Sequence, residues 1–239
     1  MDVAKFEWLV TNQCLFFAPA NGFPDPFEGS TPEGVLKWWK SAEANATNDE
    51  QRDIFQHNCK FLSEMAAGFR EHYYVSCWHM NRDEDLDMWK CYTTSPEAIT
   101  LRTTYCVLRE CVPNYVRMGM VRYIDYLTER LPMMNMFEYI MHKQLCFSFE
   151  REVRAVVWSL EEAVQPEYVY KSQDSPGFHT FLPPVDLSLM VRGIVLHPRA
   201  TPDFHARMIS LCSTNGLPKP ETSKFCEPTP SYSNLRKSN

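Results

Sequence analysis

Residues 149–158 read Phe-Glu-Arg-Glu-Val-Arg-Ala-Val-Val-Trp, a charged segment that runs without a break into an apolar one. The β-branched apolar half predicts a buried strand over 151–158. Alternate side chains of an extended segment share a face, so Glu150, Glu152 and Arg154 are expected in one row, about 6.5–7 Å apart. This stretch therefore predicts a core strand with a line of charges along it.

The charges in this row point to a chemistry because they are expensive to bury. A carboxylate removed from water needs a paired cation or takes up a proton. Arg154 can satisfy one carboxylate by a bidentate ion pair, which leaves the other with a raised pKa, as in general bases and hydroxyl-binding groups. Glu150, Glu152 and Arg154 are therefore our candidate catalytic residues. The alternative is a solvent-facing strand edge or a structural ion pair.

A second candidate segment is the loop over residues 22–29, Gly-Phe-Pro-Asp-Pro-Phe-Glu-Gly. Prolines on both sides of Asp25 stiffen the backbone, so its carboxylate is held in place at little entropic cost. Phe27 can pin the loop to the body of the protein. We assign Asp25, Phe27 and Glu28 as candidate ligand-binding residues. The alternative is a surface turn in which Asp25 bonds to its own backbone.

Aromatic and cationic side chains supply the remaining candidates. Trp89 and Tyr92 lie on a predicted helix over 83–92, where they can wall a pocket for a flat ligand, although such aromatics are also typical of a core. Lys143 and Arg102 are candidate contacts for an anionic group. Neither the cysteines nor the histidines show the spacing of a four-ligand zinc site, so we assign no metal ligands and leave the cofactor unknown.

Hydrophobic periodicity predicts a chain in which helices and strands are interspersed. Helices are expected around residues 6–10 and 134–143 and over 33–44, 49–71, 83–92, 104–111 and 202–215; strands are expected over 14–18, 73–79, 98–103, 116–124, 151–158, 167–171 and 191–196. This order indicates an α+β or mixed α/β fold, with a central mixed sheet flanked by helices. We expect one globular domain over 1–217 and a flexible Pro/Ser-rich tail over 218–239.

Composition excludes several classes of protein. The eight glycines allow neither G-x-G-x-x-G nor G-x-x-x-x-G-K-[ST], which argues against Rossmann-type dinucleotide binding and P-loop phosphate transfer. No apolar run is long enough to cross a bilayer. The net charge of −6 argues against a broad nucleic-acid surface. Nine cysteines without a C-x-x-C motif fit reduced thiols, so we expect a cytoplasmic protein.

Several motifs together resemble a known bacterial family. They are PDPFEG (24–29), VSCWHM (75–80), DMWKCY (87–92), AITLRTTYCVLRE (98–110), VRYIDY (121–126), HKQLCFSFEREVRAVV (142–157) and VRGIVLHPRATPDFHARMISL (191–211). From about Cys14 to about Phe225 the chain is similar, in this order, to the family of domain of unknown function 2971. Pro24 departs from the pattern, since the family usually has Asn there. The resemblance implies a mixed α/β domain and no established activity.

The leading hypothesis is an enzyme that acts on a nucleotide-type or other small anionic ligand through the Glu-x-Glu-x-Arg strand. By analogy alone, a carboxylate strand beside an aromatic wall is similar to ADP-ribosyl-transferring folds, in which a glutamate holds a ribose hydroxyl. One alternative is a non-catalytic sensing or interaction module. Another is a metal-dependent phosphoesterase with Asp25, Glu28, Glu150 and Glu152 as oxygen ligands. The substrate and the oligomeric state stay open.

Overall fold

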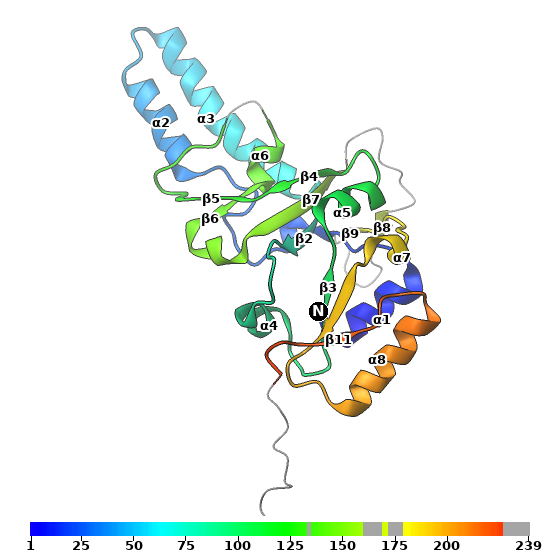
Figure 1. The fold of residues 1–239 in the computed structure, drawn as a ribbon. Coiled ribbons are helices and arrows are strands. Elements are labelled where there is room, and N and C mark those ends of the chain that lie inside the picture. The colour runs from blue at the N-terminus through cyan, green and yellow to red at the C-terminus, as the bar shows by residue number, and fades with distance from the viewer. Residues whose placement is uncertain (133–134, 160–168, 172–178, 227–239) are drawn as a thin grey trace, which may run out of the picture. The chain divides into compact units, whose positions relative to one another are not determined.

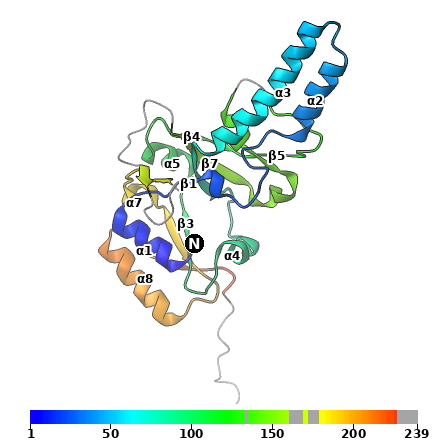
Figure 2. The same cartoon turned by 180° about the vertical axis from the view of Figure 1, so that it is seen from behind.

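The structure is a computed structural model that describes residues 1–132, 135–159, 169–171 and 179–226. The chain divides into two compact units, which are described separately. Unit 1 comprises Met1–Gln13, Arg82–Cys111 and Val185–Asn239, and unit 2 comprises Cys14–Asn81 and Val112–Pro184. Figure 1 labels most of the helices and strands of both, and Figure 2 shows them from behind. Helices flank mixed sheets, which confirms the α+β fold class.

Unit 1 is built around a three-stranded sheet in which β10 is central. Its elements are α1 (Val3–Asn12), α4 (Leu86–Tyr92), β3 (Ile99–Arg102), α5 (Tyr105–Cys111), α7 (Leu187–Met190), β10 (Gly193–Leu196), α8 (Pro202–Thr214) and β11 (Glu221–Thr222). Strand β10 pairs antiparallel with β3 and parallel with β11. The sequence sets the start of α8, because the Thr201 hydroxyl caps the Phe204 N–H at 3.2 Å and Pro202 occupies the first turn.

Unit 2 contains the largest sheet. Its elements are β1 (Ala18–Pro19), η1 (Ala20–Gly22), α2 (Glu33–Ala44), α3 (Asp49–Arg70), β2 (Tyr73–His79), β4 (Arg117–Met120), β5 (Arg122–Ile124), α6 (Phe137–Ile140), β6 (His142–Gln144), η2 (Leu145–Glu150), β7 (Glu152–Trp158), β8 (Val169–Lys171) and β9 (His179–Phe181). The order β1-β2-β7-β4 is antiparallel throughout, and α2 and α3 lie side by side as a hairpin (Figure 1).

Strand β7 is buried along almost its whole length between β2 and β4. Its apolar residues explain this burial, and Glu152 and Arg154 are buried with them. Cys77 of β2 and Gly119 of β4 are the Cα partners of Arg154, so its backbone lies between two neighbouring strands. The alternative of a solvent-facing strand edge is therefore wrong, and these charges belong to the interior.

Most predicted elements are present, with three local corrections. The predicted strand 116–124 is two strands with different partners, because β4 pairs with β7 and β5 pairs with β6; Val121 between them donates its N–H to the Glu152 carbonyl at 2.9 Å. The predicted strand 14–18 is mostly isolated bridges, because its partner segment includes prolines that carry no N–H to donate. The helix expected near 134–143 covers α6 alone, and β6 starts two residues later.

The structure bears only in part on the predicted domain organisation. Residues 221–222 form β11, so regular structure continues past the predicted domain end at residue 217. Residues 227–239 of the predicted tail lie outside the described residues. The division into two units does not test whether residues 1–217 fold as one domain, and that stays a prediction.

A glycine fixes the contact between α2 and the loop that follows β5. The Gly34 N–H donates to the Tyr126 carbonyl at 3.2 Å. A Cβ at Gly34 would lie 2.2 Å from the carbonyl oxygen of Glu129. Because this atom is backbone, it cannot rotate away as a side chain would. A side chain at position 34 therefore has to push the loop off the helix.

We expect Gly34→Ala to lower the free energy of unfolding by about 1–3 kcal/mol, the usual cost of overpacking. Gly68→Ala is the matched control, because nothing lies within 4 Å of a Cβ there and alanine favours a helix interior by up to about 1 kcal/mol. Urea denaturation measures both. Equal stabilities for the two variants would show that the loop yields freely at Gly34.

Candidate functional site

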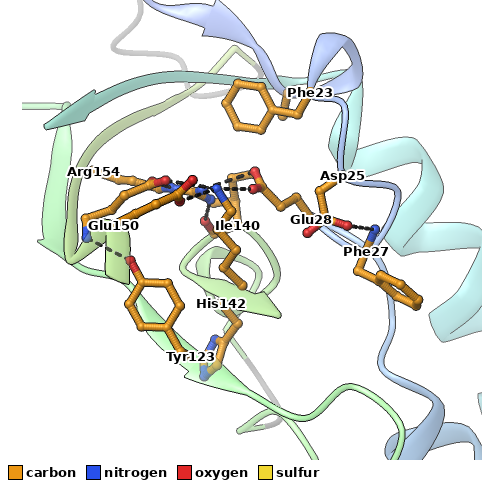
Figure 3. Close-up of polar contacts among 12 residues, drawn as sticks. Phe23, Asp25, Phe27, Glu28, Tyr123, Ile140, His142, Glu150 and Arg154 are labelled. Carbon is orange, nitrogen blue, oxygen red and sulfur yellow. Dashed lines mark hydrogen bonds and ion pairs between the residues drawn. The ribbon is translucent and has the colours of Figure 1, made fainter. Parts of the chain in front are cut away.

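Lys143 lies at the centre of a buried group of charges in unit 2. Its Nζ is 2.9 Å from Glu28 Oε1 and 2.5 Å from Glu150 Oε2. Its distance to Glu152 Oε1 is 3.0 Å. We call Glu28, Lys143, Glu150, Glu152 and Arg154 the charge cluster. Figure 3 shows Glu28, Glu150 and Arg154 of this cluster converging from different segments.

Arg154 is the second cation of the charge cluster and is fully buried. Its Nε donates to Glu152 Oε2 at 2.6 Å, and its Nη2 donates to Glu28 Oε2 at 3.1 Å. Its Nη1 donates to the Ile140 carbonyl at 2.7 Å. Glu28 and Glu152 thus each bridge both cations, and both oxygens of each carboxylate are used. Charges of opposite sign alternate around the closed group, which offsets the cost of burying them.

Strand pairing between distant segments brings Lys143 to this place. Strands β5 and β6 pair in parallel, with Tyr123 in register with Lys143. The Tyr123 hydroxyl accepts the N–H of Glu152 at 2.8 Å, which ties this pair to the start of β7 (Figure 3). Burial raises the pKa of Tyr123, so its hydroxyl is neutral and keeps a proton to donate.

Glu150 reaches the charge cluster by a different path from the one its sequence spacing predicts. It ends the 3-10 helix η2, and Arg151 has the left-handed φ of 42°. The strand starts only at Glu152, so the prediction of one extended row from Glu150 to Arg154 is wrong. The left-handed residue turns the chain back, and the Glu150 carboxyl meets Lys143 from the turn.

The loop that carries Glu28 is held by the last residue of α3. The Arg70 guanidinium donates to four carbonyl oxygens of this segment, those of Ala20, Phe23, Asp25 and Pro26, at 3.0–3.2 Å. One side chain thus donates to every one of these carbonyls, of which those of Ala20 and Asp25 also accept an N–H of the loop itself. Arg70 was not predicted as a site residue, because one arginine near a helix end carries no sign of such a role.

The pKa values of two neighbouring carboxyl groups in the charge cluster, Glu150 and Glu152, are shifted in opposite directions. Burial, together with the hydrogen bond to Glu152, raises the pKa of Glu150 to about 7. Burial also works to raise the pKa of Glu152, but the Arg154 guanidinium and the hydrogen bond from Glu150 outweigh it and hold that pKa well below its usual range. Glu152 is thus the fixed anion and Glu150 the carboxyl that exchanges a proton near neutrality.

Solvent reaches the charge cluster at one edge. The side chains of Lys143 and Glu150 are 10% and 11% exposed. The values for Glu152 and Arg154 are 5% and 1%, and Glu28 is 3% exposed. A small molecule would therefore meet Glu150 and Lys143 first, with the other three residues behind them.

Asp25 and Phe27 lie in the loop beside the charge cluster (Figure 3). Asp25 Oδ1 accepts the Phe27 N–H at 2.9 Å, which is the local turn that was the alternative to ligand binding. Asp25 Oδ2 is buried and has no hydrogen-bond partner among the residues that the structure describes. The Phe27 ring packs on Tyr126, with 5.5 Å between ring centroids. Their ligand-binding role stays a prediction.

Trp89, Tyr92 and Arg102, the other predicted ligand contacts, belong to unit 1 and are described within it. Trp89 is buried against Ala98 and Val195, which matches the alternative of a core residue. Tyr92 is half exposed at the end of α4, and Arg102 pairs with the exposed Glu221 at 3.6 Å. Whether these three serve the charge cluster stays a prediction.

Cys77 is a neighbour of the charge cluster that sequence analysis did not select. It faces Arg154 across the β2–β7 pairing. Its side chain is exposed on β2.

The donor set also bears on metal binding. Within the described ranges, no group of three or more His, Cys, Asp or Glu residues is arranged to hold a metal ion. The Lys143 ammonium already occupies the space among the three carboxylates of the charge cluster. Three of the four donors that the phosphoesterase alternative requires, Glu28, Glu150 and Glu152, are therefore engaged with Lys143 or Arg154.

Searches among protein-family models, curated proteins and solved structures found no match to this chain. The resemblance to the family of domain of unknown function 2971 stays a prediction. No helix in the described part of the chain has the length and apolarity to span a bilayer.

Arg154→Met tests how strongly the charge cluster supports the fold. Removing one partner of a buried ion pair leaves uncompensated charge, so we expect the free energy of unfolding to fall by about 3–5 kcal/mol. Arg52→Met is the control, because Arg52 pairs with Asp49 on the surface of α3 and its loss should leave stability nearly unchanged. Urea denaturation measures both, and equal small losses would contradict a stabilising role for the cluster.

Proposed function

We propose that this protein is an enzyme that binds a small hydroxyl-bearing molecule of the nucleotide type at the charge cluster, and that Glu150 accepts and returns a proton there. The observation that carries the proposal is the position of Glu150. Its carboxyl is at the solvent-reached edge of the cluster, whereas Glu28 and Glu152 each use both oxygens on Lys143 and Arg154. Glu150 contacts Lys143, and none of the described contacts joins Glu150 to the Arg154 guanidinium.

The charge balance supports proton exchange at this position. Three carboxylates and two cations give 2 − 3 = −1 when all are ionised. Uptake of one proton by Glu150 makes the cluster neutral, and the Glu150 pKa of about 7 permits this near physiological pH. A general acid–base group works best when its pKa lies near the working pH.

The net charge of the cluster also indicates which part of a ligand binds there. A cluster that is neutral or carries one negative charge does not attract phosphate, and the Lys143 ammonium is already bonded to three carboxylates. A hydroxyl group can donate its proton to ionised Glu150 and then accept the proton back. We therefore assign the hydroxyl part of the ligand, such as a ribose, to the charge cluster. The predicted contact of Lys143 with an anion is replaced by a role in holding Glu150.

Each remaining residue of the cluster keeps Glu150 in position. Lys143 fixes one oxygen of the Glu150 carboxyl at 2.5 Å. Glu152 stays ionised because Arg154 faces it, so it can accept a hydrogen bond from protonated Glu150. Glu28 completes the charge compensation of both cations. Glu150 is thus the proposed catalytic residue, and Glu152 and Arg154 are positioning residues.

A second function is favoured by the closure of the network. All three nitrogens of the Arg154 guanidinium donate within the protein, to Glu152, the Ile140 carbonyl and Glu28. The cluster is therefore also consistent with a purely structural role inside a sensing or interaction module. In that case no ligand contacts Glu150. The family resemblance and the reduced cysteines favour a bacterial, cytoplasmic setting for either function.

Ligand binding tests the proposed function first. We expect adenosine or NAD to raise the melting temperature by mass action, and 2′,3′-dideoxyadenosine, which lacks the 2′- and 3′-hydroxyls, to leave it unchanged. Glu150→Gln should remove the shift while the protein stays folded. Nicotinamide release from NAD is the matching activity assay, with an expected loss of at least about 100-fold in the variant. If no ribose-bearing probe raises the melting temperature of the wild-type protein, the proposed enzyme function is wrong and the structural role is favoured instead.

The pH dependence of stability tests the proton of Glu150 without any ligand. A carboxyl whose pKa rises on folding contributes stability below its unfolded pKa, near 4.5, and that contribution is lost as pH rises through about 7. The stability of the wild-type protein relative to Glu150→Gln should therefore fall between about pH 5 and about pH 8. Urea denaturation at several pH values measures this. A difference that is constant with pH would mean that Glu150 titrates alike in both states.

A further inference from the structure

A separate pocket of about 480 Å³ lies in unit 2, between α2 and the loop that follows β5. Its apolar walls are Val35 and Trp38 of α2 and Leu131 and Pro132 of the loop. Sites for small molecules are usually concave, of about 300–1,000 Å³, and lined by apolar groups with a few polar ones. The volume and the walls of this pocket fit that class.

Two arginines give the pocket a positive charge. Arg122 and Arg130 line it together with Glu129. Neither guanidinium forms an ion pair or hydrogen bond within the described part of the chain. Glu129 is engaged elsewhere, because its Oε1 accepts the Asp125 N–H at 2.9 Å. The lining thus carries two guanidinium groups with unused donors and one carboxylate that is already bonded.

The indole of Trp38 holds one of these arginines in place. The Arg130 guanidinium carbon lies 5.2 Å from the centroid of the Trp38 ring, and the edge of that indole packs against Trp39 at 4.7 Å between centroids. A cation–π contact orients a guanidinium without neutralising its charge. No described residue accepts an N–H of Arg130, so these donors can serve a ligand.

The wall of the pocket is fixed before any ligand arrives. Asp125 binds back to its own loop, since its Oδ1 accepts the Leu127 N–H at 2.9 Å and its Oδ2 accepts the Thr128 hydroxyl at 2.8 Å. The close approach at Gly34 holds the Glu129 backbone against α2. A preformed wall loses little entropy on binding, which favours affinity.

The pocket is distinct from the charge cluster. Side chains alternate along a strand, so Arg122 and Tyr123 point to opposite sides of β5. Tyr123 contacts the charge cluster through the Glu152 N–H, and Arg122 lines the pocket on the other side. Neighbouring residues of β5 thus contact the two sites, which have no residue in common.

We propose that this pocket binds a small organic anion, with its phosphate or carboxylate group on Arg122 and Arg130 and its apolar body against Val35, Trp38 and Leu131. Two guanidinium forks match the oxygens of either anion, and their desolvation is offset by the charge that they meet. The proposal does not depend on the function assigned to the charge cluster.

Calorimetric titration of the full chain with phenyl phosphate tests the proposal. Inorganic phosphate carries the charge without the apolar ring, and phenol carries the ring without the charge. We expect phenyl phosphate to bind at least about tenfold more tightly than either, and benzoate to show whether carboxylate serves as well as phosphate. Arg122→Gln and Arg130→Gln should each weaken phenyl phosphate binding by about tenfold or more. Both side chains are exposed, so neither variant should unfold the protein.

Arg82→Gln is the matched control for net charge, because Arg82 is an exposed arginine of unit 1 that does not line the pocket. It should leave binding unchanged. Glu150→Gln should also leave it unchanged, which separates this site from the charge cluster. Three results would overturn the proposal: no binding of phenyl phosphate, binding no tighter than that of inorganic phosphate, or equal weakening by Arg82→Gln and the two pocket variants.

Discussion

The charge compensation between two buried cations and three carboxylates is the interaction on which unit 2 depends. Moving a single ion from water to a protein interior costs several kcal/mol, so none of these groups could be buried alone. Their mutual contacts join the loop of Glu28, strand β6, the turn before Arg151 and strand β7. Segments far apart in the sequence are thereby fixed to one another, and the Arg70 contacts extend the constraint to α3.

The sequence was informative about which groups take part and less informative about how they meet. Burial of the AVVW segment predicted that Glu152 and Arg154 would be desolvated and paired, and they are. Glu28 and Lys143 were selected as candidates, but as contacts for a ligand. Their contact follows from the parallel pairing of β5 with β6 and from the folding of a loop onto β7. Pairing between distant segments leaves no local periodicity, so spacing alone could not reveal it.

Local backbone geometry accounts for the errors. The alternation rule places Glu150 on the strand, but it holds only while the backbone stays extended, and Arg151 adopts a left-handed conformation. Arginine has no particular preference for that conformation, so the residue type does not predict it. The aromatic pattern around Trp89 was equally ambiguous. A buried core ring and a pocket wall require the same residue types, and only the contacts with Ala98 and Val195 separate them.

The number of charges in the cluster bears on what it is for. A support made of Glu28, Glu152, Lys143 and Arg154 is already neutral, with two anions and two cations. A third carboxylate adds a desolvation cost, and a neutral amide at the same position could still accept a hydrogen bond from Lys143. The structural role therefore requires an acceptor at position 150 but no ionisable group. A group that can gain and lose a proton at the solvent-reached edge is what acid–base chemistry requires, and this surplus charge favours an enzyme over a passive support.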